Sequence, residues 1–227
     1  MSTKLPDGQE LWTAVDQYIV EHVVPPDPAL EQATQANAAA HLPAIDVTPN
    51  QGKFLHLLAR IRGAKRILEI GTLGGYSTIW LARALPTEGK LITLEVNPAH
   101  AKIALANIER AGLTAKVELR LGPALDSLAQ LEKEKTAPFD FIFLDADKRS
   151  NPVYLKRVLP LSRSGTVIVV DNVVRDGELI EDGNDDPDVQ GSRRIFEMLA
   201  KDTRLDATAL QTVSSKRHDG FVLAMVR

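Results

Sequence analysis

Short runs of apolar residues alternate along this chain with longer stretches in which apolar residues recur at helical spacing. The short runs predict strands at residues 67–70, 91–95, 116–121, 139–144 and 166–170. Strands separated by helices are typical of a mostly parallel sheet with helices on both faces. The pattern therefore predicts an α/β fold with a doubly wound sheet.

The last part of the chain has a different pattern. Residues 208–213 and 220–226 both favour strands, and only the polar residues 214–219 separate them. So short a connection joins antiparallel neighbours, because parallel strands need a longer crossover. We expect the sheet to end in an antiparallel pair.

Several helices carry start or stop signals. Thr48-Pro49, Asn97-Pro98 and Asn151-Pro152 each place a capping side chain before a proline that suits the first turn. Gly112 is expected to end the helix that starts at Asn97. These signals support the alternation of strands and helices.

The chain before residue 48 predicts two helices. Pro25-Pro26 ends the first, and Asp27-Pro28 begins the second, which continues to Ala40. One face of the first helix carries Leu11, Val15, Tyr18, Ile19 and Val23. We expect a single domain over residues 1–227, with residues 1–47 as a helical cover and residues 48–227 as the core. One interpretation of the cover is that it only packs over the sheet edge. The other is that it closes the opening to the substrate site or forms a dimer contact.

Charge and composition narrow the classes of function. The formal net charge is −3 at pH 7, which provides no general attraction for nucleic acid or an anionic membrane. The chain has no cysteine, which excludes disulfides and thiolate metal sites. No apolar run at the N-terminus is typical of a signal peptide or a spanning helix, so we expect a cytoplasmic protein without a membrane partner.

The segment from Arg66 to Ser77 predicts a strand, a tight glycine turn and the start of a helix. Gly71, Gly74 and Gly75 permit backbone conformations and close approaches that a ligand above a helix N-terminus requires. In open α/β sheets, nucleotide-like ligands bind beyond the carboxyl end of such a strand. The turn is therefore the candidate cofactor site.

Two classes of cofactor could use this turn. A dinucleotide site requires G-x-G-x-x-G, but Leu73 stands at the middle glycine position. Glu69 would repel a pyrophosphate, whereas it suits the amino group and the positive sulfonium of S-adenosylmethionine. Glu95 ends the next strand, where an acid accepts hydrogen bonds from ribose hydroxyls. S-adenosylmethionine is the favoured cofactor.

Oxygen-bearing side chains follow two further strands. Asp145 comes after the run at 139–144, and Asp171 and Asn172 come after the run at 166–170. Because the carboxyl ends of parallel strands meet at one edge of a sheet, these side chains should converge beside the cofactor crevice. Carboxylate and amide oxygens favour a hard divalent cation, such as magnesium, calcium or manganese.

Three segments together resemble the signatures of the cation-dependent O-methyltransferases of the caffeoyl-CoA and catechol type. They are Glu-Ile-Gly-Thr-Leu-Gly-Gly-Tyr-Ser at 69–77, Leu-Asp-Ala-Asp-Lys at 144–148 and Asp-Asn-Val-Val-Arg-Asp-Gly at 171–177. The similarity extends from about Val47 to the C-terminus. It implies a class I methyltransferase with a Rossmann-like fold, whose seven-stranded, mostly parallel sheet has an antiparallel last strand. Relatives are commonly homodimers.

The resemblance also implies roles for individual residues. The cofactor-binding positions are Val47, Glu69, Gly71, Thr72 and Ser77 at the methionine end, Glu95 at the ribose, and Ala124 and Asp147 at the adenine side. The metal ligands fall on Asp145, Asp171 and Asn172, and the proton-accepting lysine falls on Lys148. Val47 replaces the threonine of the plant enzymes, so its contact can only be through the main chain or by packing.

The implied reaction is the methylation of one hydroxyl of a vicinal diol, such as a catechol or a caffeoyl-type small molecule. A phenol is mostly protonated at pH 7 because its pKa is about 10. A divalent cation chelated by two adjacent oxygens makes the phenolate easier to form, and Lys148 could accept the proton as a neutral amine. Residues 173–191, where the substrate-facing loop is expected, give little basis for naming the acceptor.

Three alternatives remain open. One is a methyltransferase of the same fold that acts on a tRNA hydroxyuridine, with a basic patch at Arg62, Lys65 and Arg66. The net charge speaks against it. Another is a nicotinamide-dependent oxidoreductase, which Leu73 disfavours. The third is a cofactor-binding scaffold without catalytic activity.

Overall fold

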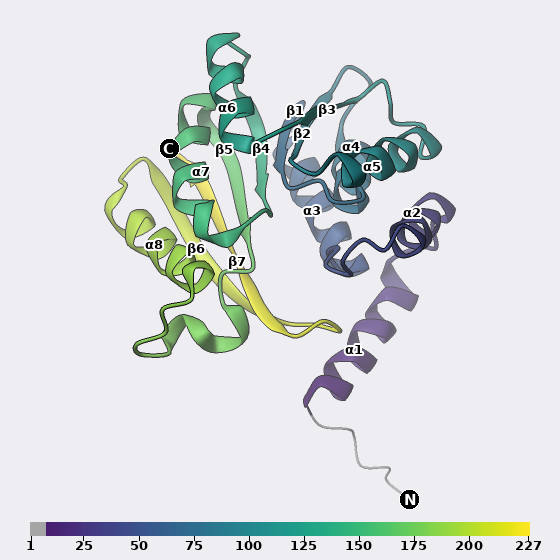
Figure 1. Cartoon of the computed structure of the whole chain (residues 1–227), viewed down its shortest axis with the longest axis horizontal. Helices are drawn as coiled ribbons and strands as arrows, with labels where there is room; N and C mark the ends of the chain where they lie inside the picture. The colour runs from purple at the N-terminus through teal and green to yellow at the C-terminus, as the bar shows by residue number, and fades with distance from the viewer. Residues whose placement is uncertain (1–7) are drawn as a thin grey trace, which may run out of the picture.

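The apolar runs form the centre of a seven-stranded sheet in the computed structural model, which describes residues 8–227 (Figure 1). The strands are β1 (Arg66–Ile70), β2 (Lys90–Glu95), β3 (Val117–Leu121), β4 (Phe139–Leu144), β5 (Ser162–Asp171), β6 (Leu205–Val213) and β7 (His218–Val226). Their order across the sheet is β3-β2-β1-β4-β5-β7-β6, and every pair from β3 to β5 is parallel. Because the order reverses between β1 and β4, a crevice is expected at their carboxyl ends.

The tail of the chain forms the predicted antiparallel pair. β7 runs antiparallel to both β5 and β6. β6 begins at Leu205, earlier than the apolar pattern indicated, because residues 205–207 pair with the end of β7. The class I methyltransferase topology inferred from the sequence is therefore confirmed.

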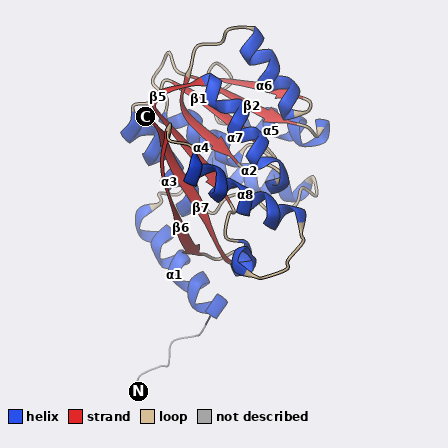
Figure 2. Cartoon of the chain, turned by 90° about the vertical axis from the view of Figure 1, so that its left-hand side faces the viewer, coloured by secondary structure: helices blue, strands red, loops and turns tan. Residues whose placement is uncertain are grey.

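Helices cover both faces of the sheet (Figure 2). They are α1 (Gly8–Val23), α2 (Pro28–Ala39), α3 (Pro49–Arg62), α4 (Tyr76–Ala84), α5 (Pro98–Arg110), α6 (Ala124–Lys133), α7 (Asn151–Val158) and α8 (Pro187–Lys201), with short 3-10 turns η1 (Lys148–Ser150), η2 (Leu159–Leu161) and η3 (Arg175–Ile180). None of the helices in the described residues is both long and apolar enough to cross a membrane.

The side chains of β4 show how one strand serves two cores. Phe141 and Phe143 pack with the layer that contains α2 to α5. Ile142 and Leu144 point to the other face and pack with α6, α7 and α8. Successive side chains of a strand point to opposite faces, so a strand covered on both sides is apolar throughout.

The capping signals are correct at three of the expected helix starts. Asp27 accepts hydrogen bonds from the Ala29 and Leu30 backbone N–H groups, and Thr48 and Asn97 cap α3 and α5. The expected cap at Asn151 is wrong. Asn151 is instead the first residue of α7, is fully buried, and its side-chain amide has no hydrogen-bond partner among the described residues.

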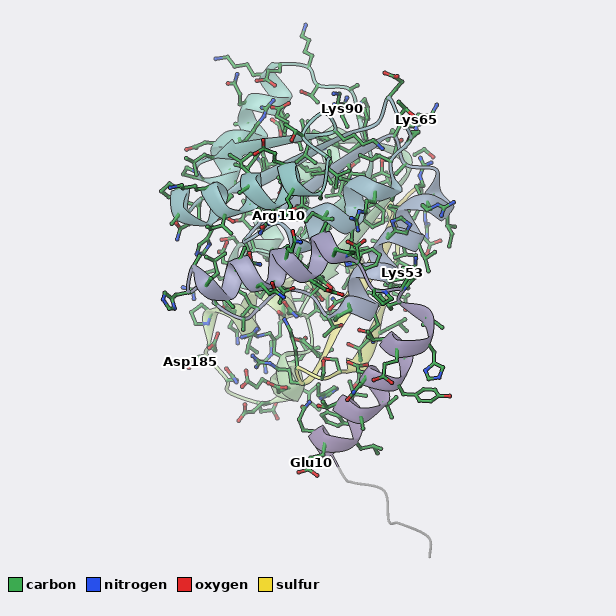
Figure 3. All side chains as sticks on the ribbon, turned by 90° about the vertical axis from the view of Figure 1, so that its right-hand side faces the viewer. Glu10, Lys53, Lys65, Lys90, Arg110 and Asp185 are labelled. Atoms are coloured by element: carbon green, nitrogen blue, oxygen red, sulfur yellow. The ribbon has the colours of Figure 1, made fainter. Side chains whose placement is uncertain are left out.

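The first helix turns its predicted apolar face outward. Val15, Tyr18, Ile19 and Val23 are 37% to 64% exposed. Asp16, the next residue after Val15, is 7% exposed and accepts hydrogen bonds from Asn50 Nδ2 at 2.9 Å and from the Ser215 N–H at 2.7 Å. These polar contacts help to set the orientation of α1, which lies at one end of the molecule with Glu10 near its outer end (Figure 3).

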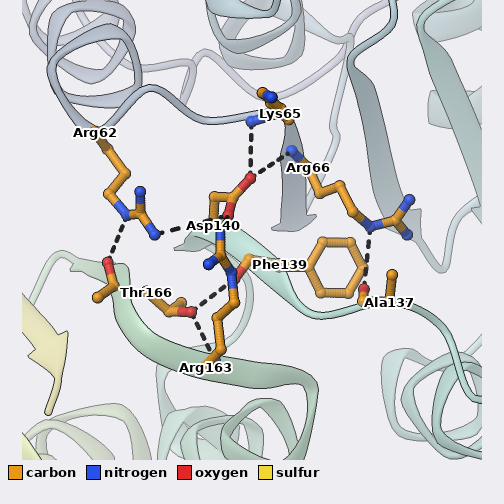
Figure 4. Close-up of polar contacts among 9 residues, drawn as sticks. Arg62, Lys65, Arg66, Ala137, Phe139, Asp140, Arg163 and Thr166 are labelled. Carbon is orange, nitrogen blue, oxygen red and sulfur yellow. Dashed lines mark hydrogen bonds and ion pairs between the residues drawn. The ribbon is translucent and has the colours of Figure 1, made fainter.

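The amino ends of the central strands are joined through Asp140 (Figure 4). Its carboxylate accepts hydrogen bonds from the Lys65 and Arg66 N–H groups at 2.8 and 3.1 Å, and forms ion pairs with Arg163 and Arg62. Burial alone would raise the pKa of Asp140, but these donors outweigh burial and lower it. The network lies at the sheet edge opposite the carboxyl ends of the strands.

Candidate active site

A cavity of about 1270 Å³ lies at the carboxyl ends of β1, β2, β4 and β5. Residues 43–48, between α2 and α3, and the connection between β6 and β7 complete its wall. The predicted site residues that line it are Val47, Gly71, Thr72, Ser77, Glu95, Ala124, Asp145, Asp147, Lys148, Asp171 and Asn172. Positions spread over much of the sequence therefore meet in one space.

The glycine turn packs directly against the end of β4. Gly71 has a φ of 102°, and a Cβ atom there would lie 2.1 Å from the carbonyl oxygen of Asp145. The Gly71 N–H donates to the Leu94 carbonyl, and the Asp145 N–H donates to the Ile70 carbonyl. Only glycine combines this backbone conformation with this close approach, so Gly71 brings the cofactor turn next to Asp145.

The carboxylate of Glu95 is held in place by two backbone N–H groups, one in the glycine turn and one just after β2. Its Oε2 accepts from the Leu73 N–H and its Oε1 from the Asn97 N–H, each at 2.8 Å. Each carboxylate oxygen has two lone pairs, so Glu95 can still accept further hydrogen bonds from a ligand. It lies in the cavity wall, where the sequence placed a ribose-binding acid.

Glu69 lies behind the cavity wall. Its carboxyl group is fully buried and accepts hydrogen bonds from Ser77 at 2.6 Å, Thr93 at 2.7 Å and Thr78. Burial raises the pKa of Glu69 to about 7, although the three hydroxyl donors lower it. Ser77 lines the cavity and Glu69 does not, so the structure places Ser77 between Glu69 and a ligand. The predicted cofactor contact of Glu69 stays a prediction.

Two acidic side chains face the same part of the cavity from neighbouring strands. Asp145 Oδ1 pairs with Lys148 Nζ at 2.7 Å, and Lys148 is 8% exposed. Asp171 accepts from Gln51 Nε2 at 2.7 Å and from the Asn172 N–H at 2.9 Å. Burial raises the pKa of Asp171 to about 7, and the negative charge of Asp145 contributes in the same direction.

The oxygen donors here suit a hard cation. Asp145, Asp171 and Asn172 all line the cavity, and Asn172 has a φ of 54°, a conformation that asparagine tolerates better than most residues. Among the described residues, no three histidine, cysteine or acidic side chains form a metal-binding cluster. The donor set therefore consists of two carboxylates and one amide, a chemistry that magnesium, calcium and manganese share.

Asp147 belongs to a separate polar contact. Its carboxylate accepts hydrogen bonds from Tyr154 at 2.7 Å and from Ser150. Burial raises the pKa of Tyr154, and the hydrogen bond to Asp147 adds to the shift. Lys148, the next residue, turns the other way and pairs with Asp145. The local chain thus sends adjacent charged side chains to different parts of the cavity.

Several residues of the site have no signal in the sequence. Gln51 lies in the first turn of α3, yet its side chain reaches Asp171 across 120 positions of sequence. Phe54 and Phe221 line the cavity together, with ring centroids 5.2 Å apart. Lys216 enters from the β6–β7 connection, which the sequence indicated only as a polar turn. These contacts arise from chain packing and not from local motifs.

The comparisons with known proteins agree with this geometry. The sequence profile of a family described as O-methyltransferase matches residues 20–225. The chain is 53% identical to a catechol O-methyltransferase of Niastella koreensis over 97% of this chain and 100% of that protein. It is 49% identical to a catechol O-methyltransferase of Mycobacterium tuberculosis, over 94% and 95% of the two chains.

A solved structure shares the fold over nearly the whole chain. The O-methyltransferase from Bacillus cereus in complex with SAH superposes with a TM-score of 0.95 at 60% sequence identity. The match covers 96% of this chain and 100% of that one.

Glu69 should give the folded protein a pH dependence whose sign follows from its raised pKa. Unperturbed, its pKa is 4.5, and burial raises it to about 7. Between these values the folded protein retains a proton that the unfolded chain has released. The free energy of unfolding should therefore fall as pH rises through this window, by up to about 1.4 kcal/mol per pH unit, and this contribution should level off above pH 7.

Urea unfolding of the wild type and of Glu69→Gln from about pH 5 to about pH 8 measures this effect. The variant cannot titrate at this position. The difference in the free energy of unfolding between variant and wild type should therefore shift in favour of the variant as pH rises. Glu109→Gln, an exposed substitution on α5, serves as the control. Parallel curves for wild type and Glu69→Gln would contradict the assigned pKa.

Glu95→Ala should weaken binding of S-adenosylhomocysteine (SAH) by roughly 1.5 to 3 kcal/mol, the range for hydrogen bonds to a charged group. Calorimetry measures the affinity, and thermal unfolding checks that the variant is folded. Glu88→Ala removes an exposed acid between α4 and β2 and should bind normally. Unchanged affinity in folded Glu95→Ala would exclude a role of this carboxylate in cofactor binding.

Proposed function

This chain belongs to the O-methyltransferase family and is an S-adenosylmethionine-dependent enzyme. We propose that it methylates one hydroxyl of a catechol or caffeoyl-type small molecule with the help of a divalent cation. The observation that carries the proposal is the convergence of Asp145, Lys148, Asp171 and Asn172 in the cavity that also contains the glycine turn. Cofactor, base and chelating oxygens are thus available in one place.

In this proposal the cofactor occupies the side of the cavity formed by β1 and β2. Glu95 accepts hydrogen bonds from the ribose, the turn from Gly71 to Ser77 and the main chain at Val47 hold the methionine end, and Ala124 and Asp147 lie at the adenine side. The cofactor supplies a methyl group on a positively charged sulfur.

Asp145, Asp171 and Asn172 are the residues that would hold the cation. They provide oxygen donors only, and Gln51 fixes one oxygen of Asp171 from outside the set. Magnesium, calcium or manganese at this position would favour the phenolate over the phenol and fix two adjacent hydroxyls of the acceptor. The support for this step is the chemistry of the donor set.

Lys148 is the proposed base. Its Nζ is held 2.7 Å from Asp145 Oδ1 and lies in a mostly buried position, so it is close to the chelating oxygens without being one of them. As a neutral amine, it would take the proton from the reacting hydroxyl. Phe54 and Phe221 offer an apolar wall for the aromatic ring and keep water from part of the cavity.

Two of the three basic residues invoked for the tRNA alternative, Arg62 and Arg66, have partners within the protein. Arg62 donates to the Gly165 carbonyl and pairs with Asp140, and Arg66 donates to the Ala137 carbonyl. These contacts, drawn in Figure 4, lie at the amino ends of β1 and β4, whereas the cavity lies at the carboxyl ends of the strands. The predicted homodimer and cytoplasmic location stay predictions. The exposed apolar side chains of α1 support a dimer, because their burial would be favourable.

Removal of divalent cations with EDTA should abolish methyl transfer, and magnesium or manganese should restore it. Asp171→Ala should mimic chelation, because it removes one of the proposed donors. Asp206→Ala, an exposed acid on β6 outside the cavity, is the matched control and should keep full activity. Full activity of the wild type in the presence of EDTA would rule out the proposed role of the cation. The proposed binding of S-adenosylmethionine would not be affected by that result.

Catechol, guaiacol and phenol, assayed side by side, test the acceptor geometry. Catechol should react fastest, since only catechol offers two free adjacent hydroxyls for chelation. Lys148→Ala should reduce the catechol rate by about 10²-fold or more if Lys148 is the base. Equal rates on the three compounds would refute the diol requirement, and an unaffected Lys148→Ala variant would refute the base.

A further inference from the structure

Lys216 is a cationic residue of the cavity wall that the proposed reaction does not use. It lies in the connection between β6 and β7 and lines the same cavity as Asp145 and Asp171. Its ammonium group has no hydrogen bond or ion pair with another described residue, and the charges of Asp46, Asp145 and Asp171 act on it only at longer range. Burial lowers the pKa of Lys216, which is consistent with an enclosed position.

The three acids near Lys216 already have other partners. Asp145 pairs with Lys148 and Asp171 accepts from Gln51, each at 2.7 Å. Asp46 accepts from Asn37 Nδ2 at 3.0 Å. The fold therefore does not require the Lys216 ammonium as a hydrogen-bond donor to any of them.

The cation proposed above would offset two of the three negative charges that act on Lys216, those of Asp145 and Asp171. Lys148, beside these carboxylates, would become positively charged once it takes the proton of the acceptor. Arg175, from the segment after β5, also lines the cavity, and its Nε is buried without a hydrogen-bond partner in the described chain. A negative group on the acceptor would satisfy these side chains.

The turn that carries Lys216 is fixed by the N-terminal helix. Asp16 accepts from the Ser215 N–H at 2.7 Å, and Gln9 Nε2 donates to the Ser214 carbonyl at 2.9 Å. Asp16 also accepts from Asn50, the neighbour of the Gln51 that holds Asp171. The carboxylate of Asp16 thus connects the turn that carries Lys216 to the start of α3, where Gln51 holds Asp171. This connection limits how far the distance between Lys216 and Asp171 can vary.

We propose that Lys216 selects acceptors that carry an anionic substituent, in the simplest case a carboxylate, in addition to the two adjacent hydroxyls. The inference rests on the proposed function and names the substrate class within it. The hydroxyls face Asp171, the ring packs on Phe54 and Phe221, and the carboxylate pairs with Lys216, with Arg175 as a second cation. Lys216 is then a specificity-determining residue and not part of the methyl-transfer step.

Three matched acceptors test the proposal: 3,4-dihydroxybenzoate, its neutral amide and 3,4-dihydroxybenzylamine, which is a cation at pH 7. With saturating S-adenosylmethionine and magnesium, the wild type should show a kcat/KM for the benzoate about 10-fold or more above that for the amide, mostly through KM. The benzylamine should be the poorest acceptor.

Three variants identify the residue responsible. Lys216→Met should bring the benzoate and the amide within about 2-fold of each other, and Lys216→Glu should shift the preference towards the benzylamine. Arg175→Met should reduce the preference for the benzoate to a smaller extent. Lys201→Met removes an exposed lysine at the end of α8 and should keep the wild-type preference.

A binding measurement separates recognition from turnover. Calorimetry with 3,4-dihydroxybenzoate, in the presence of SAH and magnesium, should show weaker binding to Lys216→Met than to the wild type and Lys201→Met. Thermal unfolding and SAH affinity verify that each variant is folded. Equal kcat/KM values for the three acceptors in the wild type would overturn the assignment. So would kcat/KM ratios between the acceptors that are unchanged from the wild type in both Lys216→Met and Arg175→Met. Failure to methylate any of the catechols would instead overturn the proposed function on which it rests.

Discussion

The site depends first on the contact between the turn after β1 and the backbone at the end of β4. No side chain fits between Gly71 and the Asp145 carbonyl, because a Cβ would lie 2.1 Å from that oxygen. Hydrogen bonds from Gly71 to β2 and from Asp145 to β1 hold the three strand ends together. As a result, the glycine turn proposed to bind the cofactor and Asp145, proposed to bind the cation, are held next to each other by direct backbone contact.

Charge is the second determinant of the site. Asp145 and Asp171 are neighbouring acids in a partly enclosed space, an arrangement that would be unfavourable without compensation. Lys148 offsets Asp145, and Gln51 donates to Asp171. Positive charge remains available to a ligand at Lys216 and Arg175. The same cavity thus has carboxylate and amide oxygens in one part and the cationic side chains of Lys216 and Arg175 in another, an arrangement that suits the proposed acceptor with two hydroxyls and an anionic group.

The N-terminal helices support the wall of the site through hydrogen bonds and are not only a covering layer. The segment after α2 supplies cavity residues from Pro43 to Thr48. Asn37 on α2 donates to Asp46 and accepts from Asn107, which also donates to the Gly74 carbonyl of the cofactor turn. Asp16 on α1 fixes the β6–β7 connection. The hydrogen bonds of Asp16 hold one side of α1 against the rest of the molecule, while Val15, Tyr18 and Ile19 stay exposed.

The sequence by itself determined the strand and helix order, the glycine turn after β1 and the acids at the strand ends, because each of these depends on local signals. Apolar runs are visible wherever a strand is buried on both faces, and Glu95, Asp145 and Asp171 stand at strand ends that a parallel sheet brings to one edge. Only the tertiary structure decided the position of Glu69 behind Ser77, the outward face of α1, and the presence of Gln51 and Lys216 in the cavity. Each of these results from hydrogen bonds or packing between residues far apart in the chain, and such contacts leave no periodicity or motif in the segments that form them.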